Sequence, residues 1–239
     1  MAESTTPPVP DRPAPPRSGP EHSALAVVLG VREGRLRTLL WERARDPFAG
    51  AWALPGGLLA PGETLDDSIR RHLAAKVDVA ELAHAEQLGT WSDPSRSPGR
   101  WELATAFLGL VPADADPRLP SDTAWHTVDD LPPLAFDHAE IVLAGRERLR
   151  AKLSYTNIGY ALAPEVFTLP ELRGLYVAAL GHDVSATNLK RVLLRRDVLA
   201  PAGGRRDPGR AGGRPAELYR FRAQRLEITD QFAVLRPPT

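Results

Sequence analysis

The sequence of 239 residues contains no cysteine, a single methionine, no excess of either charge and no long apolar segment. Without cysteine, neither disulfide bonds nor thiolate metal sites are available, which suits a reducing compartment. No run of 18 apolar residues occurs, and the chain does not start with a basic segment followed by an apolar one. We therefore expect a soluble, cytoplasmic, bacterial protein without a membrane partner.

Large apolar side chains are also scarce in residues 1–22, which hold seven prolines. Such a segment cannot bury enough surface to offset the entropy lost on ordering, so we predict a disordered tail. The chain is 43% apolar overall, enough for two packed domains. We place these domains at residues 23–153 and 154–225, with a second tail at residues 226–239.

The first domain begins with sequence patterns of a β-sheet. Residues 24–31 form a continuous apolar run, residues 36–42 follow it as a second predicted strand, and Glu33-Gly34 between them predicts a hairpin turn. Residues 51–55, 86–91, 101–111 and 125–128 predict further strands. Asp137 and Glu140 then form an N-cap pattern ahead of a helical spacing that continues to about Leu153.

A loop followed by a helix is predicted within residues 56–79, the most informative stretch of the chain. Gly56-Gly57 signals a loop, and Thr64 with Asp67 can cap a helix over residues 64–77. The stretch resembles the Nudix box, in which a glycine, five residues, a glutamate and seven residues precede Arg-Glu-X-X-Glu-Glu. An ordinary amphipathic helix is the simpler interpretation, but the match to the box extends over many positions. The positions in register are Gly57, Glu63 and Arg71.

The metal-binding glutamates of that box are replaced in this sequence. Hydrolases of the family need carboxylates at helix positions i, i+3 and i+4, because these side chains share one face and together hold divalent cations. His72, Ala75 and Lys76 occupy those positions. A lysine ammonium 4 Å from Mg²⁺ would be repelled by roughly 8 kcal/mol at an effective dielectric constant of about 20. The resemblance thus implies a Nudix fold, an α/β/α sandwich of α/β (α+β) class. The chemistry of the replaced residues predicts a domain without catalytic residues, metal or cofactor.

The resemblance also implies a nucleotide pocket bordered by the loop between residues 91 and 101, although a solvated turn is the simpler interpretation of that loop. The candidate ligand-binding residues are Gly57, Glu63, Arg71, Lys76, Asp93, Arg96, Arg100 and Glu102. Arg71 is expected to pair with Glu63, and Lys76 to replace the missing cation beside a diphosphate. The alternative is an active Nudix hydrolase of a nucleoside diphosphate linked to another moiety, with Mg²⁺ held by Glu63, Asp66, Asp67 and distant carboxylates. A non-catalytic interaction scaffold is a third possibility.

The second domain has the spacing of a helix-turn-helix unit. Thr168 and Glu171 form a capping box that opens a helix to Leu180, and Ser185 can cap a second helix that ends near Arg196. A glycine- and arginine-rich segment over residues 201–215, between two short apolar strands, predicts a wing whose arginines pair with phosphates.

Basic residues are concentrated in this helix-turn-helix and wing region. Residues 185–222 carry ten basic and three acidic side chains, a net charge of +7 within a neutral chain. Such asymmetry indicates a nucleic-acid surface, whereas a solvated linker is the simpler alternative. The predicted DNA-binding residues are Ser185, Thr187, Asn188, Lys190, Arg191, Arg195, Arg205, Arg206, Arg210 and Arg214.

Two further sequence segments narrow the resemblance to one subgroup of the family. LAFDH at residues 134–138 and SYTNIGYALAPEVFTLPEL at residues 154–172 resemble the Nudix-related transcriptional regulators of NAD metabolism, and the match covers about residues 24–222. The resemblance implies a Nudix-type sensor joined to a C-terminal winged helix. It further implies a homodimer on a palindromic double-stranded DNA operator, with ADP-ribose or a related NAD-derived nucleotide as the effector that is bound and not cleaved.

Overall fold

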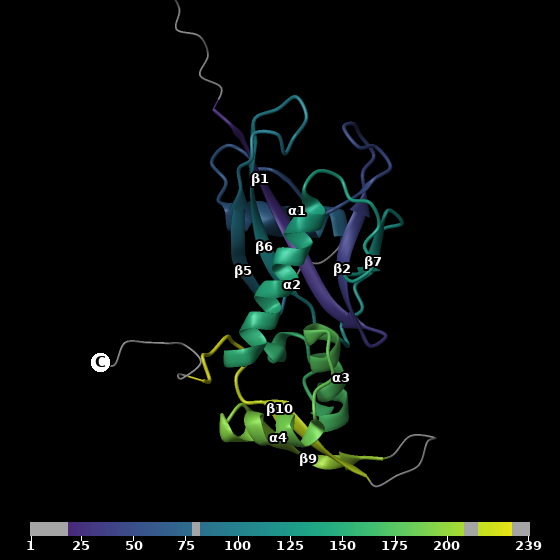
Figure 1. Ribbon diagram of the computed structural model, residues 1–239, viewed down its shortest axis with the longest axis vertical. Helices are drawn as coiled ribbons and strands as arrows, with labels where there is room; N and C mark the ends of the chain where they lie inside the picture. The colour runs from purple at the N-terminus through teal and green to yellow at the C-terminus, as the bar shows by residue number, and fades with distance from the viewer. Residues whose placement is uncertain (1–18, 78–81, 208–214, 231–239) are drawn as a thin grey trace, which may run out of the picture.

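A seven-stranded sheet forms one body of the molecule (Figure 1). The computed structural model describes residues 19–77, 82–207 and 215–230. The sheet has the order β3-β2-β1-β6-β5, with β4 paired to β1 and β7 paired to β2. β1 and β6 are parallel, and the other pairs are antiparallel. The strands are β1 (Glu21–Arg32), β2 (Arg35–Glu42), β3 (Trp52–Ala53), β4 (Gly56–Leu58), β5 (His84–Trp91), β6 (Glu102–Leu110) and β7 (Thr123–Thr127).

Two helices cover the two faces of this sheet. In Figure 1, α1 (Leu65–Val77) lies behind the sheet and α2 (His138–Tyr155) in front of it. Because successive side chains of a strand point to opposite faces, β1 contributes to both cores. Ala24, Ala26 and Val28 share a core with α1, and Leu25, Val27 and Leu29 share a core with α2. The expected α/β/α sandwich is confirmed.

A smaller body follows α2 along the chain. It contains the 3₁₀ turn η1 (Ile158–Ala161), β8 (Phe167–Thr168), α3 (Leu169–Leu180), α4 (Ala186–Arg195), β9 (Leu199–Arg206) and β10 (Ala216–Phe221). Its sheet has the order β8-β10-β9, and α3 and α4 pack on it, which confirms the expected winged helix. The buried side chains of this body and those between α2 and the large sheet form one continuous cluster.

The predicted helix caps of the winged helix are confirmed. The backbone N–H of Glu171 donates to Thr168 Oγ1 at 3.4 Å, and that of Thr168 donates to Glu171 Oε2 at 2.7 Å, which completes the capping box. Gly181 ends α3 with φ +77°. The backbone N–H of Asn188 donates to Ser185 Oγ, which caps α4.

Several expected boundaries differ from the structure. β1 begins at Glu21, inside the segment predicted as a disordered tail, because its first residue pairs with Glu102 of β6. Gly56 and Gly57, predicted as a loop, form β4: a Cβ at Gly56 would lie 2.2 Å from the Ala24 carbonyl oxygen, so only glycine can pair there. Residues 201–206, predicted as wing loop, belong to β9.

The segment after β10 was expected to be a tail, but residues 226–230 are held against the body. The N–H of Asn157 donates to the Glu227 carbonyl, and Ile228 forms a β-bridge with Thr156. Thr229 and Asp230 both donate their N–H groups to the Tyr155 carbonyl. Residues 1–18 of the first tail and 231–239 of the second lie outside the described residues.

Candidate functional site

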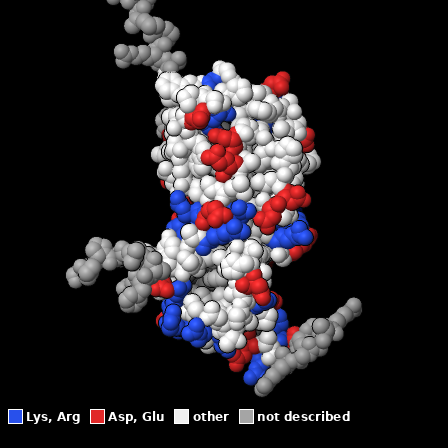
Figure 2. Space-filling view, in the orientation of Figure 1, with Lys and Arg blue, Asp and Glu red and all other residues white. Residues whose placement is uncertain are grey.

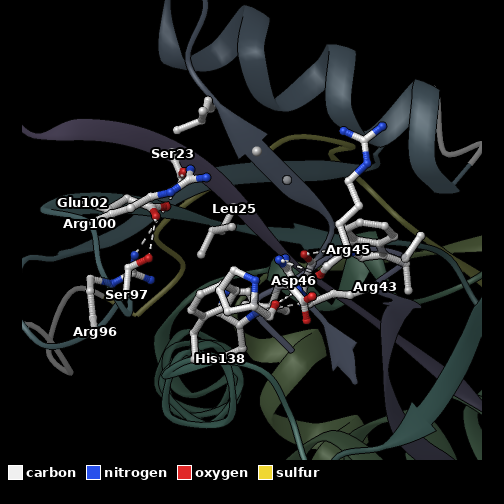
Figure 3. A pocket seen from close by; sticks show the side chains of 18 residues that line it. Ser23, Leu25, Arg43, Arg45, Asp46, Arg96, Ser97, Arg100, Glu102 and His138 are labelled. Carbon is white, nitrogen blue, oxygen red and sulfur yellow. Dashed lines mark hydrogen bonds and ion pairs between the residues drawn. The ribbon is translucent and has the colours of Figure 1, made fainter. Parts of the chain in front are cut away.

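A pocket of about 530 Å³ opens beside the first half of β1 (Figure 3). Its walls come from β1, β4, the segment 43–47 after β2, the segment 96–102 that leads into β6, and the start of α2. Figure 3 shows Arg96, Arg100 and Glu102 on one side, Arg43, Arg45 and Asp46 on the other, and His138 below. The pocket thus depends on segments that are far apart in the sequence and meet only in the folded sheet.

Positive charge predominates in this pocket. Four arginines and two carboxylates line it, so these side chains give a net charge of +2. Arg43 donates from Nε to the Pro47 carbonyl at 3.0 Å, and its guanidinium lies 4.8 Å from the centre of the Phe136 ring. Burial lowers the pKa of Arg43 from its ordinary value, opposed by the charge of Glu102. An anion in the pocket would relieve the desolvation cost of this guanidinium.

An aromatic wall stands beside the arginines. The Phe136 ring contacts Phe48 edge-on, with centroids 4.9 Å apart, and lies 5.2 Å from the His138 ring. Phe136 has φ +56°, a left-handed backbone conformation that is costly for a large side chain. His138 is fixed by the N–H of Leu54, which donates to its Nδ1 at 3.0 Å. Charged donors next to a flat apolar wall suit a ligand that combines an anion with a planar ring.

Arg96 connects this pocket to the start of α2. Its side chain is only 3% exposed and is bound on two edges. Nε and Nη2 donate to the two carboxylate oxygens of Asp137, at 2.9 and 2.8 Å, and Nη1 lies 3.6 Å from Glu102 Oε1. The expected N-cap role of Asp137 is therefore wrong: it occupies the N-cap position, but its side chain makes no cap hydrogen bond because it faces Arg96.

Half of the predicted ligand-binding residues line the pocket, and their role there stays a prediction. Gly57, Arg96, Arg100 and Glu102 belong to the lining, whereas Glu63, Arg71 and Asp93 do not. Asp93 instead accepts hydrogen bonds from the N–H and hydroxyl of Ser95. Lys76 lies in the last turn of α1, and its side chain is outside the part that the structure describes.

The expected pairing of Arg71 with Glu63 is confirmed. Arg71 Nε donates to Glu63 Oε1 at 2.6 Å and Nη2 donates to Oε2 at 2.7 Å. The hydrogen bond from Arg71 is the main reason why the pKa of Glu63 is lowered to about 2, and the N–H of Ala60 adds to it. The one box glutamate that this chain keeps is therefore committed to an arginine.

The face of α1 where a Nudix box carries its glutamates does not suit Mg²⁺. His72 takes the first of these positions, is buried, and shares a 3.2 Å contact between its Nε2 and the Leu58 carbonyl oxygen. Ala75 offers no donor atom. In the described part of the chain, no three His, Asp or Glu side chains are grouped closely enough to hold a metal ion. Mg²⁺ prefers oxygen ligands in octahedral arrangement, which these residues do not supply.

Sequence reasoning missed most of the pocket lining, including five residues on which its charge and its aromatic wall depend. Arg43, Arg45 and Asp46 lie in what was expected to be an ordinary loop or strand end, and no motif marks them. Phe136 and His138 lie within the phrase that indicated the regulator subgroup, so the resemblance pointed to their segment without assigning them a role. The burial of a charged Arg43 next to Phe136 depends on contacts across 93 residues of chain and has no local signal.

Helix α4 presents a polar face at the far end of the molecule. Leu189 and Leu193 are buried, while Ser185, Thr187, Asn188, Arg191 and Arg195 are exposed. Arg191 Nη2 donates to Asn188 Oδ1 at 2.8 Å, so these two side chains lie together on the exposed face. An exposed row of Arg and Asn on the second helix of a helix-turn-helix unit can reach base edges in the major groove.

The wing adds further basic side chains, visible together with those of α4 at the lower end of the molecule in Figure 2. Arg205 is exposed on β9, whereas Arg206 is paired with Glu171 at the start of α3. The Lys190 ammonium lies 5.8 Å from the centre of the Tyr219 ring of β10, so it faces the wing and not the open side of α4. Arg210 and Arg214 lie outside the described residues.

None of the helices in the described part of the chain combines the length and hydrophobicity that a membrane span requires.

Two domain families match the sequence. The NUDIX domain matches residues 20–144, and the NrtR DNA-binding winged helix domain matches residues 159–221. The two matches correspond to the two bodies of the fold.

Three relatives share most of one or both bodies. The ADPR responsive transcriptional repressor NtrR of Acinetobacter baylyi is 29% identical over 205 residues, which cover 83% of this chain and 80% of the repressor. The crystal structure of Shewanella oneidensis NrtR complexed with a 27mer DNA is 32% identical with a TM-score of 0.74, covering 83% of this chain and 92% of that one. The NUDIX domain of the same NrtR, complexed with ADP ribose, is 30% identical with a TM-score of 0.52, covering 57% of this chain and 94% of the domain.

Proposed function

Since the chain belongs to the NrtR family, in which a Nudix domain precedes a DNA-binding winged helix, we propose that it is a transcriptional regulator that responds to ADP-ribose or a related nucleotide. The winged helix binds double-stranded DNA through α4 and the wing. The pocket beside β1 takes the effector, and its occupancy changes the affinity for DNA.

The observation that carries this proposal is the net charge of +2 in a pocket with an aromatic wall. The diphosphate of ADP-ribose is a dianion at neutral pH and would lie among Arg43, Arg45, Arg96 and Arg100. A planar base or ribose would pack against Phe136. Charge-assisted hydrogen bonds from guanidinium to phosphate are among the strongest available to a protein, so this arrangement supports binding without a metal ion.

We further propose that the bound nucleotide is not hydrolysed and that the protein has no metal cofactor. In a hydrolase, carboxylate-bound metal ions would neutralise the developing charge and activate water. Here the box offers His72, Ala75 and Lys76, and Glu63 is held by Arg71. The described part of the chain therefore has binding groups for a diphosphate but not the ligand set that cleavage requires.

Calorimetry and a turnover assay test the two halves of this proposal separately. ADP-ribose should bind with a saturable heat in the presence of EDTA, and Arg43→Ala should weaken binding at least about tenfold, as expected for loss of a charged hydrogen bond of about 1.5–3 kcal/mol. Incubation with Mg²⁺ or Mn²⁺ should release no AMP. Release of AMP that EDTA abolishes would instead establish a Nudix hydrolase.

DNA binding requires an operator, which in vitro selection with the full chain can supply. We expect a palindromic site, because a homodimer repeats its half-site contacts, and sedimentation should show a dimer. Contacts to about six phosphates predict a slope of about −5 in a plot of log affinity against log salt concentration. A flat salt dependence would refute binding of DNA through phosphate contacts, since such contacts release counterions.

A further inference from the structure

Helix α2 connects the pocket to the winged helix. Its 18 residues span about 27 Å along the helix axis. His138, its first residue, lines the pocket, and its last turn lies against η1 and the segment after β10. Figure 1 shows α2 running across the front of the sheet down toward the level of α3. Gly145 lets the helix approach the sheet so closely that a Cβ there would lie 2.7 Å from Val27 Cγ1. A rigid element therefore joins the two candidate sites.

A buried ion pair helps to hold the pocket end of α2, together with the hydrogen bond from the Leu54 N–H to His138. Arg96 lines the pocket and donates two hydrogen bonds to Asp137, the residue immediately before α2. An anion that enters the pocket competes with the Asp137 carboxylate for this guanidinium, because two of its three nitrogens already donate to Asp137 and the third lies near Glu102. Loss of the pair would leave the first turn of α2 without its attachment to the segment before β6.

Backbone strain lies at the same point. Phe136, directly before Asp137, adopts φ +56° and is held there by the Arg43 guanidinium and the Phe48 ring. Conformations of this kind persist only where surrounding contacts enforce them, and they occur often in segments that switch. A ligand that engages Arg43 and Arg96 would act on two of the contacts that hold this segment.

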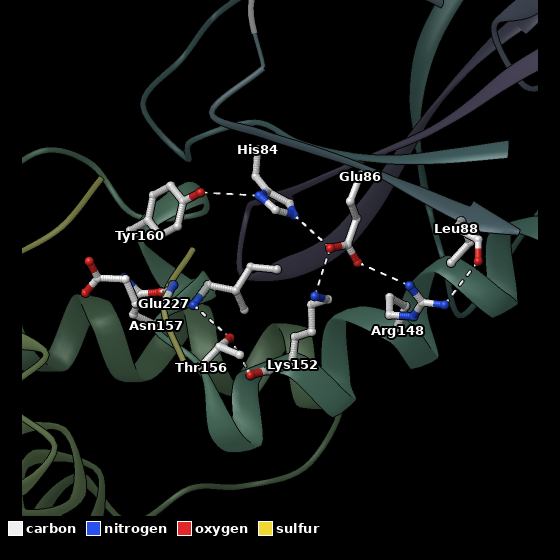
Figure 4. A network of polar contacts seen from close by, with 10 residues as sticks. His84, Glu86, Leu88, Arg148, Lys152, Thr156, Asn157, Tyr160 and Glu227 are labelled. Carbon is white, nitrogen blue, oxygen red and sulfur yellow. Dashed lines mark hydrogen bonds and ion pairs between the residues drawn. The ribbon is translucent and has the colours of Figure 1, made fainter. Parts of the chain in front are cut away.

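The opposite end of α2 is tied to the sheet and η1 through Glu86 (Figure 4). Glu86 of β5 accepts from Lys152 Nζ at 2.8 Å and from Arg148 Nη1 at 3.3 Å, both on α2. His84 bridges Glu86 Oε2 and the Tyr160 hydroxyl of η1, each at 3.3 Å. These contacts make the last turns of α2 and the first residues of the winged helix one connected unit.

A second connection leads from the end of α2 to the DNA-facing helix. The Tyr155 carbonyl accepts the N–H groups of Thr229 and Asp230, and the Asp230 carboxylate pairs with Arg196, the residue that ends α4. Asn157 Nδ2 donates to the Arg225 carbonyl at 2.8 Å, which holds the same segment in place. A displacement of α2 along its axis is thus transmitted to the C-terminal end of α4.

We propose that Asp137 is the switch residue of this protein: an anionic effector displaces it from Arg96, and the resulting movement of α2 repositions α4 for or against DNA. This inference rests on the proposed function and adds the route by which the pocket regulates DNA binding. Two states follow, one with the Arg96–Asp137 pair formed and one with the pair broken and Arg96 available to the ligand. Removal of the carboxylate favours the second state without any ligand.

The test is Asp137→Asn, which removes the charge and keeps the size of the side chain. We expect ADP-ribose to bind the variant at least about threefold more tightly, because the competitor for Arg96 is weakened. Its DNA affinity without ADP-ribose should equal that of the wild type saturated with ADP-ribose. The ratio of DNA affinities with and without ADP-ribose, typically about 5–150 for coupled sites, should fall to within about twofold of one. Calorimetry and fluorescence anisotropy with the selected duplex supply these values.

Glu140→Gln is the matched control. Glu140 also lies in the first turn of α2, accepts a hydrogen bond from Trp91 Nε1 at 3.1 Å, and can keep it as an amide. This variant loses the same charge and should respond to ADP-ribose like the wild type. Asp137→Glu, which can still reach Arg96, should restore most of the response and excludes a defect of folding as the cause.

The outcomes separate this inference from the proposed function. If the wild type binds DNA equally with and without ADP-ribose, the proposed effector is wrong, and the inference falls with it. If the wild type responds and Asp137→Asn responds equally, the proposed function stands and the role of Asp137 is refuted. A loss of response in Glu140→Gln of the same size would also refute it, because any charge in that turn would then suffice.

Discussion

Substitution of Gly57 by alanine tests where the altered box helix packs. An ideal Cβ on Gly57 of β4 would lie 2.6 Å from His72 Cε1, and 3.0 and 3.2 Å from the two ring nitrogens. The ring cannot rotate freely, since His72 is buried and its Nε2 contacts the Leu58 carbonyl oxygen. Either α1 or β4 must therefore shift. Overpacking of this kind typically costs about 1–3 kcal/mol.

Thermal denaturation measures this cost directly. For a chain of this size, each kcal/mol lowers Tm by roughly 2–4 °C, so Gly57→Ala should lower it by roughly 2–12 °C. Because β4 lines the pocket, ADP-ribose affinity should fall as well. Gly174→Ala is the control: Gly174 lies in α3 with no heavy atom within 4 Å of an added Cβ, so Tm should stay or rise.

A double-mutant cycle shows whether His72 is the cause. His72→Ala removes the ring and destabilises by itself, but it also makes room for the new methyl group. The double variant should therefore be more stable than the sum of the single effects predicts, by roughly 0.5–2 kcal/mol. Additive effects, or a Gly57→Ala variant that melts within about 1 °C of the wild type, would refute the packing of His72 against β4.

Three other outcomes follow from the structure. Arg191→Ala or Arg195→Ala should cost about 1–3 kcal/mol of binding free energy on the selected duplex but little on a scrambled one. Arg205→Ala should weaken binding to both duplexes equally and reduce the salt slope by about one. Equal losses for Arg191→Ala on both duplexes would contradict its role in base recognition. Burial lowers the pKa of His84 below its usual 6.5, so the unfolded chain binds more protons below that pH. The free energy of unfolding should hence fall as the pH drops below about 6.5, and His84→Gln should flatten this dependence in thermal melts. Asp230→Asn should reduce the response of DNA binding to ADP-ribose while calorimetry finds the affinity for ADP-ribose unchanged; an unaltered response would show that α2 does not act through α4.

The elements that were predictable from the sequence depend on neighbours within a few residues. The Glu33-Gly34 turn requires positive φ at both positions, and the chain adopts +51° and +71° there. The capping box joins Thr168 and Glu171, which are three positions apart in the sequence. In each case the side chain that fixes the backbone belongs to the same short segment, so no tertiary contact competes with the local preference.

The pocket was only partly predictable, because its contacts are not local. Asp137 has the residue type and position of an N-cap, yet it binds Arg96, 41 residues earlier in the chain, since a buried guanidinium needs a charged partner more than a helix terminus does. Gly57 was recognised through the box register, but its conformation is that of a strand paired to β1. A family resemblance identified the segments that meet at the pocket, whereas the pairing within it required the fold.

The charge of the pocket explains how nucleotide recognition can survive the loss of the box. None of the α1 side chains that the structure describes lines the pocket, and the four arginines of the pocket come from segments 43–45 and 96–100. In a metal-dependent site, carboxylates repel a diphosphate until Mg²⁺ bridges the two, so affinity depends on the metal ion. Here the net charge of +2 already attracts a dianion without a metal ion. ADP-ribose affinity measured by calorimetry should therefore agree within about twofold in MgCl₂ and in EDTA at equal ionic strength, because screening is then the same. Tighter binding by tenfold or more in MgCl₂ would mean that a metal ion still mediates recognition, and that the arginines alone do not hold the diphosphate.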